Sequence, residues 1–143
     1  MMWIEQFITS FVASAAFGLI FNVPRQTLLQ CGVVGTIGWI GYKCCLQLGV
    51  DVIPATLMAV IAVTVISQLF AKLYKTPIIV FSVAGIIPLV PGGIAYDAMR
   101  NVVENNYDAA VQLGVMAFML SGTIAIGLVL SEVVNQLMRK SQR

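Results

Sequence analysis

The sequence predicts an all-α integral membrane protein with five transmembrane helices, the fourth of which is broken at Pro88, Pro91, Gly92 and Gly93. Composition indicates the class: 59% of the 143 residues are hydrophobic, 10% are charged, and the mean hydropathy is +0.95. Soluble domains are typically about 45–50% apolar and about 25% charged. The number of helices follows from five apolar segments that approach the roughly 20 residues needed to cross a bilayer. We therefore expect a single transmembrane domain over residues 1–143.

Proline and glycine residues divide and shape these segments. Pro24 ends the first segment, because it cannot continue a helix and it holds Val23 in an extended conformation. Pro54 lies near the start of the third segment, where proline is tolerated. The second segment is the least apolar, since it carries a row of glycines. The expected helices cover about residues 4–21, 27–46, 52–73, 77–105 (broken near 88–93) and 109–137.

The fourth segment begins as an apolar helix at Pro77 and then interrupts itself. Pro88 and Pro91 have no N–H group, so the carbonyls of Ala84 and Ile87 lose their helical partners. The eleven residues from Pro77 to Pro88 span about 17 Å at about 1.5 Å per residue, which places the break near the middle of the bilayer. Unpaired backbone groups there cost several kcal/mol each unless protein, water or a ligand satisfies them. The sequence leaves open a plain structural proline kink.

A second half-helix is expected to start near Pro91, a residue suited to the first turn of a helix. Its free N–H groups, from Gly92 onward, would lie at the positive end of the helix dipole. Interrupted membrane helices of this kind hold substrate carboxylates in several secondary transporters. The residues expected to bind a substrate are Pro88, Pro91, Gly92, Gly93, Asp97 and Arg100.

Polar side chains follow the break at helical spacing. Asp97, Arg100, Asn101 and Glu104 are three to four residues apart, which places them on one face of a helix. A polar face is unfavourable against lipid, so it should line a cavity, meet a partner or rise into the outer interface. Asp97 is one candidate for proton coupling. Glu132 in the fifth segment is the other, although a carboxylate near a helix end can also reach the interface without such a role.

Four glycines recur every three residues in the second segment. Small residues let helices approach each other closely in lipid, where packing drives their association. We expect these glycines to pack helices together; a sliding surface within a moving transporter is the functional alternative. The residues are Gly32, Gly35, Gly38 and Gly41.

The basic residues indicate the orientation of the chain in the membrane. With five crossings, the loops after the first and third helices lie on the same side as the C-terminus. Most of the Lys and Arg residues fall on that side, which should be cytoplasmic, so we expect the N-terminus outside and the C-terminus inside. These residues are Arg25, Lys72, Lys75, Arg139, Lys140 and Arg143.

Several function classes find no support in the sequence. Histidine is absent, and Cys31, Cys44 and Cys45 lack the spacing of metal ligands, so we expect no metal, no cofactor and no enzymatic activity. We interpret the three cysteines as free thiols packed in helices. A net charge of +2 without a basic, aromatic patch argues against nucleic-acid binding.

Three stretches of the chain carry a family resemblance. They are Phe21-Asn22-Val23-Pro24, the Gly-x-x-Gly-x-x-Gly segment that ends in Trp39, and Ile87-Pro88-Leu89-Val90-Pro91-Gly92 followed by Ala95-Tyr96-x-Ala98-Met99. Together they resemble the threonine/serine exporter family, and more narrowly its small-subunit half, as in the two-component succinate exporter of enteric bacteria. The resemblance extends over nearly the whole chain in helix number and order, and the proline–glycine break is its most specific part.

The resemblance implies export of small carboxylates or hydroxy-amino acids, such as threonine, serine or a succinate-like dicarboxylate, across the bacterial inner (plasma) membrane. It also implies a larger integral membrane subunit of the same family as partner, and a higher oligomer stays open. If that partner supplies five helices, the two halves would insert in opposite orientations, an arrangement that places a site at their interface. The alternative is a non-transporting accessory subunit that stabilises or orients a partner carrying the whole substrate site.

Overall fold

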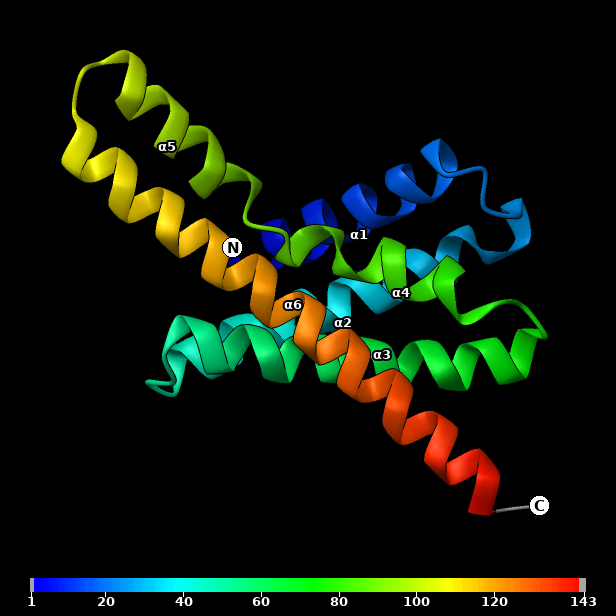
Figure 1. Ribbon diagram of the computed structural model, residues 1–143. Coiled ribbons are helices and arrows are strands. Elements are labelled where there is room, and N and C mark those ends of the chain that lie inside the picture. Colours follow the sequence, from blue (N-terminus) through cyan, green and yellow to red (C-terminus); the bar gives the residue numbers. More distant parts are fainter. Residues whose placement is uncertain (1, 142–143) are drawn as a thin grey trace.

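The structure is a computed structural model that describes residues 2–141, and these residues form helices joined by short turns, without a strand among them (Figure 1). Met1 and Arg143, at the ends of the expected domain, lie outside the described residues. The elements in chain order are α1 (Met2–Ile20), the 3₁₀ turn η1 (Arg25–Thr27), α2 (Leu28–Gln47), α3 (Val52–Tyr74), α4 (Ile78–Ile86), the 3₁₀ turn η2 (Ile87–Leu89), α5 (Gly92–Val103) and α6 (Tyr107–Ser141).

α6 is longer than the sequence predicts, since it extends beyond residues 109–137 at both ends. Its first turn carries Asp108 and its last turn carries Arg139 and Lys140. Acidic groups at the start and basic groups at the end of a helix interact favourably with the helix dipole. The polar flanks of this segment therefore continue the helix instead of ending it.

Four helices are followed, one or two positions after their last residue, by a residue with a left-handed backbone. In each case the N–H of the following residue reaches back five positions, as from Val23 to the Gly18 carbonyl at 3.0 Å. This arrangement satisfies carbonyls that the end of a helix leaves free, so the turns can stay short. The residues, after α1, α2, α3 and α5 respectively, are Asn22 (φ 56°), Gly49 (φ 84°), Lys75 (φ 50°) and Asn105 (φ 61°).

α2 lies at the centre of the bundle, in contact with α1, α3 and α4. It contributes the buried residues Cys31 and Val34 to a core that Val60 and Val63 of α3 and Phe81 of α4 complete. α5 packs chiefly against α6 and forms with it a hairpin that extends away from the other helices in Figure 1. The fold thus has a close-packed part, which carries α4, and a projecting arm, which carries α5.

Glycines in α2 allow neighbouring helices to approach its backbone. A Cβ atom at Gly35 would overlap Ser14 of α1, and one at Gly38 would overlap Val63 of α3. Gly32 faces an aromatic ring of α1 at similarly short range. These three positions leave no room for a side chain, so the helix spacing depends on them.

Within residues 2–141, three helices are long and apolar enough to cross a membrane: α1, α3 and α6. The segments Ile78–Leu89 and Gly92–Val103 pass the same test as a bent pair, which would be either a fourth, broken span or a re-entrant loop. α2 has the length of a span but is not among them, because glycines and polar residues lower its hydropathy. The count of five spans and the outside location of the N-terminus stay predictions.

Exchange of Gly38 and of Gly41 for alanine should change stability in opposite directions. At Gly38 the new methyl group would overlap Val63, and overpacking of this kind costs about 1–3 kcal/mol. Nothing lies within 4 Å of a Cβ atom at Gly41, so Gly41→Ala should stabilise the helix by up to about 1 kcal/mol through the higher helix propensity of alanine. The measurement is the melting temperature of both variants in one detergent. Equal shifts would show that the contact with Val63 does not set the helix spacing.

Candidate functional site at the helix interruption

The interruption lies between α4 and α5, where the chain changes direction. The segments Ile78–Leu89 and Gly92–Val103 are bent by 46° relative to each other. Pro88 lies in the first turn of η2, where its missing N–H group costs no hydrogen bond. Val90 then has an extended backbone (φ −64°, ψ 130°), because the residue before a proline avoids the helical region and Pro91 follows. The two prolines together account for the change of direction.

Backbone groups within the interruption pair with each other. The Val90 N–H donates to the Ile87 carbonyl at 3.2 Å, and the Gly92 N–H donates to the Val90 carbonyl at 2.8 Å. The Ala95 N–H donates to the Pro91 carbonyl at 3.0 Å and so begins the hydrogen bonding of α5. The structure differs here from the expectation that the Ile87 carbonyl and the Gly92 N–H are free. Tight turns let both groups bond to residues two or three positions away.

A cleft of about 180 Å³ lies beside the interruption, where α2, α3 and α6 also contribute side chains. Three of the residues expected at a binding site, Pro88, Pro91 and Gly93, line it. Trp39 and Tyr42 of α2 form another part of the wall, with their rings 5.5 Å apart. Pockets for drug-sized ligands measure about 300–1,000 Å³, so this cleft suits water or a molecule of a few heavy atoms.

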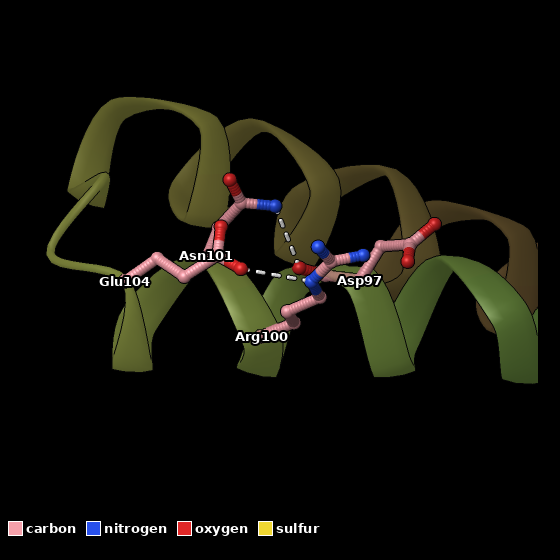
Figure 2. A network of polar contacts seen from close by, with 4 residues as sticks. All are labelled: Asp97, Arg100, Asn101 and Glu104. Atoms are coloured by element: carbon pink, nitrogen blue, oxygen red, sulfur yellow. Dashed lines mark hydrogen bonds and ion pairs between the residues drawn. The ribbon is translucent and has the colours of Figure 1, made fainter.

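The other expected binding residues, Gly92, Asp97 and Arg100, lie on α5 outside this cleft. Gly92 is exposed, and nothing lies within 4 Å of the position of a Cβ atom there. Figure 2 shows the polar face of α5, on which Arg100 Nε donates to Glu104 Oε1 at 2.9 Å. Asn101 Nδ2 donates to the backbone carbonyl of Asp97 at 2.8 Å. The Asp97 carboxylate itself forms no ion pair with a described residue.

α5 presents both charged and large apolar side chains to its surroundings. The side chains of Arg100 and Glu104 are 62% and 53% exposed. Tyr96 is 69% exposed and Val103 is 79% exposed. Because lipid suits the apolar side chains but not the charged ones, the arm has a surface for lipid and a surface for a polar neighbour or water.

Ser14 is a polar residue near the break that the sequence analysis missed. It is fully buried, and its Oγ has no hydrogen-bond partner among the described residues. It faces Gly35 of α2. A Cβ atom at Gly35 would also lie 3.6 Å from the Cγ of Pro88, so Gly35 separates Ser14 from the break. The spacing of Ser10, Ser14 and Gly18 at intervals of four residues is the signal that could have found it, because it marks a helix face made of small residues.

Glu132 lies on the part of α6 that packs against α3, away from the arm. Its carboxylate is exposed and accepts a hydrogen bond from Gln136 Nε2 at 3.2 Å. It lines a cleft of about 340 Å³ together with Lys72, Lys75 and Arg139. The structure therefore brings Glu132 together with basic residues and not with the interruption.

Of the three cysteines expected to pack in helices, Cys31 does so, whereas Cys44 is exposed and Cys45 is half-buried. The Cys31 thiol is buried and donates to the Val80 carbonyl at 3.6 Å, which joins α2 to α4. Cys44 and Cys45 are free thiols nearer the end of α2. Among residues 2–141, no three side chains of His, Cys, Asp or Glu lie close enough together to hold a metal ion.

Apolar helices of spanning length and an interrupted helix beside a cleft are features of a membrane transporter. The model of the threonine/serine exporter family (ThrE) matches residues 6–134, a stretch that includes the interruption and the whole of α5. The chain therefore belongs to the threonine/serine exporter family, and it is a membrane protein of the transporter class.

A relative of this chain is an uncharacterized protein of Haemophilus influenzae (strain ATCC 51907 / DSM 11121 / KW20 / Rd). The two are 28% identical over 127 residues, which cover 83% of this chain and 43% of the relative. The chain thus spans less than half the length of that protein. No solved structure matches the chain.

Loss of the ion pair on α5 should leave the fold intact. Arg100 and Glu104 are both exposed, and exposed ion pairs contribute about 0–1 kcal/mol. We expect Arg100→Gln and Glu104→Gln each to lower the free energy of unfolding by less than about 1 kcal/mol. The measurement is unfolding in mixed micelles followed by circular dichroism. A larger loss would show that the pair supports the fold, and it would remove the reason to seek a functional role for it.

Proposed function

We propose that this chain is one half of a secondary exporter that moves small carboxylates or hydroxy-amino acids out of the bacterial cell, through the inner membrane, together with a larger membrane partner. Threonine, serine and succinate-like dicarboxylates are the substrates in question. The observation that carries the proposal is the interrupted helix: α4 stops, two prolines redirect the chain, and α5 starts beside a small cleft inside the family-matched segment.

The start of α5 has the properties needed to bind a carboxylate. Helix N-termini attract anions through the helix dipole and free N–H groups. Gly92 and Gly93 have open space where a side chain would lie, so a ligand can approach the backbone closely. A carboxylate would compete with the Val90 carbonyl for the Gly92 N–H, because the bond between them closes only a three-residue turn. Pro88 and Pro91 would shape the site and Arg100 would attract the charged substrate.

A partner is supported by the exposure of α5 and by the length of the relative. The side chains of Asp97, Arg100 and Glu104 form no hydrogen bond or ion pair with another described helix, and in a membrane they need water or protein around them. The relative is more than twice as long as the region it shares with this chain, which leaves room for a second unit. We propose that this unit covers α5 and that the two halves rock against each other around the interruption.

Proton coupling would use one of two carboxylates. Asp97 is the candidate on the arm, on the same helix as Gly92 and Gly93. Glu132 is the candidate at the far end of α6, where Lys72 and Arg139 line the same cleft. Replacement of each by the neutral amide, Asp97→Asn or Glu132→Gln, would show which of them makes export depend on the proton gradient.

Export of threonine and of succinate from cells tests the proposal. Cells would express this chain alone, with its partner, or with the partner plus Pro91→Ala or Gly92→Leu. We expect each variant to lower export by roughly tenfold or more, which corresponds to a loss of about 1.4 kcal/mol of binding. The reason is that Pro91→Ala allows the helix to continue, and Gly92→Leu places a side chain over the start of α5.

Two matched variants control for general damage. Pro54→Ala changes a proline at the start of α3, and Gly114→Leu changes a glycine of α6 that, like Gly92, has open space around it. Both controls should export normally, and all four variants should co-purify with the partner. Normal export by assembled Pro91→Ala and Gly92→Leu would refute the proposed site. It would favour an accessory subunit that only packs against its partner, for which the close helix packing around α2 is sufficient.

A further inference from the structure

α3 and α6 cross at one close contact and separate beyond it. A Cβ atom at Gly127 would lie 2.8 Å from Val60 Cγ1, so the two backbones approach closely at this position. One turn further on, Thr64 Oγ1 donates to Ser131 Oγ at 2.8 Å. From there the last turns of α6 lead away from α3 (Figure 1). The crossing therefore opens into a wedge toward the C-terminal ends of both helices.

An apolar groove of about 520 Å³ fills one side of this wedge. Its walls are rows of apolar side chains at intervals of four residues, one row on each helix. The rows are Ile61, Val65 and Leu69 on α3, and Leu130, Val134 and Met138 on α6. All six side chains are exposed, and a groove with such walls suits a hydrocarbon chain.

Two basic side chains line the groove near the C-terminal ends of both helices. Lys72 lies in the last turn of α3 and Arg139 in the last turn of α6. The amides of Gln68 and Asn135 lie along the groove between them and the crossing. Among the described residues that line this groove there is no carboxylate. Glu132 lines the neighbouring cleft, which Lys72 and Arg139 also line together with Lys75.

We propose that this groove binds one anionic phospholipid, with an acyl chain between α3 and α6 and the phosphate held by Lys72 and Arg139. The groove has apolar walls along α3 and α6 and basic groups at the helix ends. These would face the acyl chain and the negatively charged headgroup of a phospholipid, respectively. Arg binds phosphate through two parallel hydrogen bonds, and Lys binds it as a point charge. A protein helix in the same place would need an acidic residue opposite the two cations. The inference does not depend on what the chain transports.

Native mass spectrometry of the full chain, purified in mild detergent with any subunit that co-purifies, tests this proposal. The probes are phosphatidylglycerol and phosphatidylcholine with identical acyl chains. We expect a preference for phosphatidylglycerol that falls about fivefold in Lys72→Gln or Arg139→Gln, the effect of one basic group near an anionic lipid. The matched control is Lys140→Gln, which removes the charge next to Arg139 from a side chain that lines neither cleft.

A second pair of variants tests the groove without changing charge. Val134→Trp would fill the groove, whereas Val133→Trp places the same ring on a neighbouring exposed position that does not line it. We expect only Val134→Trp to lower phosphatidylglycerol binding. Equal binding by Arg139→Gln and Lys140→Gln would overturn the proposal, because the attraction would then be a general property of the basic helix end. A photo-crosslinker at Val134 that captures protein instead of lipid would overturn it as well.

Discussion

The close approach of α2 to its neighbours is the constraint on which the rest of the structure depends. Helices in lipid gain little hydrophobic energy from association, so they pack where small residues let their backbones meet. Gly38 of α2 and Gly85 of α4 both face Val63 of α3, and Gly35 faces Ser14 of α1. Gly85 lies directly before the end of α4 at Ile86. The close packing thus reaches the last turn of α4, and Pro88 and Pro91 redirect the chain directly after it.

The interruption costs less backbone pairing than its two prolines imply. η2 and the short turn into α5 close on themselves, so the Ile87 and Val90 carbonyls both accept hydrogen bonds within the break. A buried hydroxyl without a described partner, that of Ser14, lies behind it. Such a group is costly in a low-dielectric interior unless something pairs with it. The region around Pro88 thus combines paired backbone within the break with an unpaired, fully buried hydroxyl on α1.

Much of the backbone could be predicted from the sequence, because local rules determine it. Proline without an N–H group, and apolar runs of spanning length, mark the helices and the break. The resemblance read from Ile87 to Gly92 is confirmed by the family match over residues 6–134. The candidate site was predicted less completely: Pro88, Pro91 and Gly93 meet in one cleft, but Gly92 lies outside it, and the Trp39 and Tyr42 walls come from a different helix. Spacing along one helix carries no information about such a neighbour.

By itself the sequence determined the membrane class through its composition, and the resemblance of its motifs identified the family. Proline chemistry, which acts on neighbouring residues alone, predicted where the chain changes direction. Only the tertiary structure decided which helix faces meet. It gave Gly38 a close neighbour and left Gly41 without one, although both belong to the same glycine row. It also placed Lys72 beside Arg139, which lies 67 positions further along the chain, as a pair of cations over an apolar groove. Contacts of this kind depend on how whole helices cross, and the crossing is set by packing between residues that are distant in the chain.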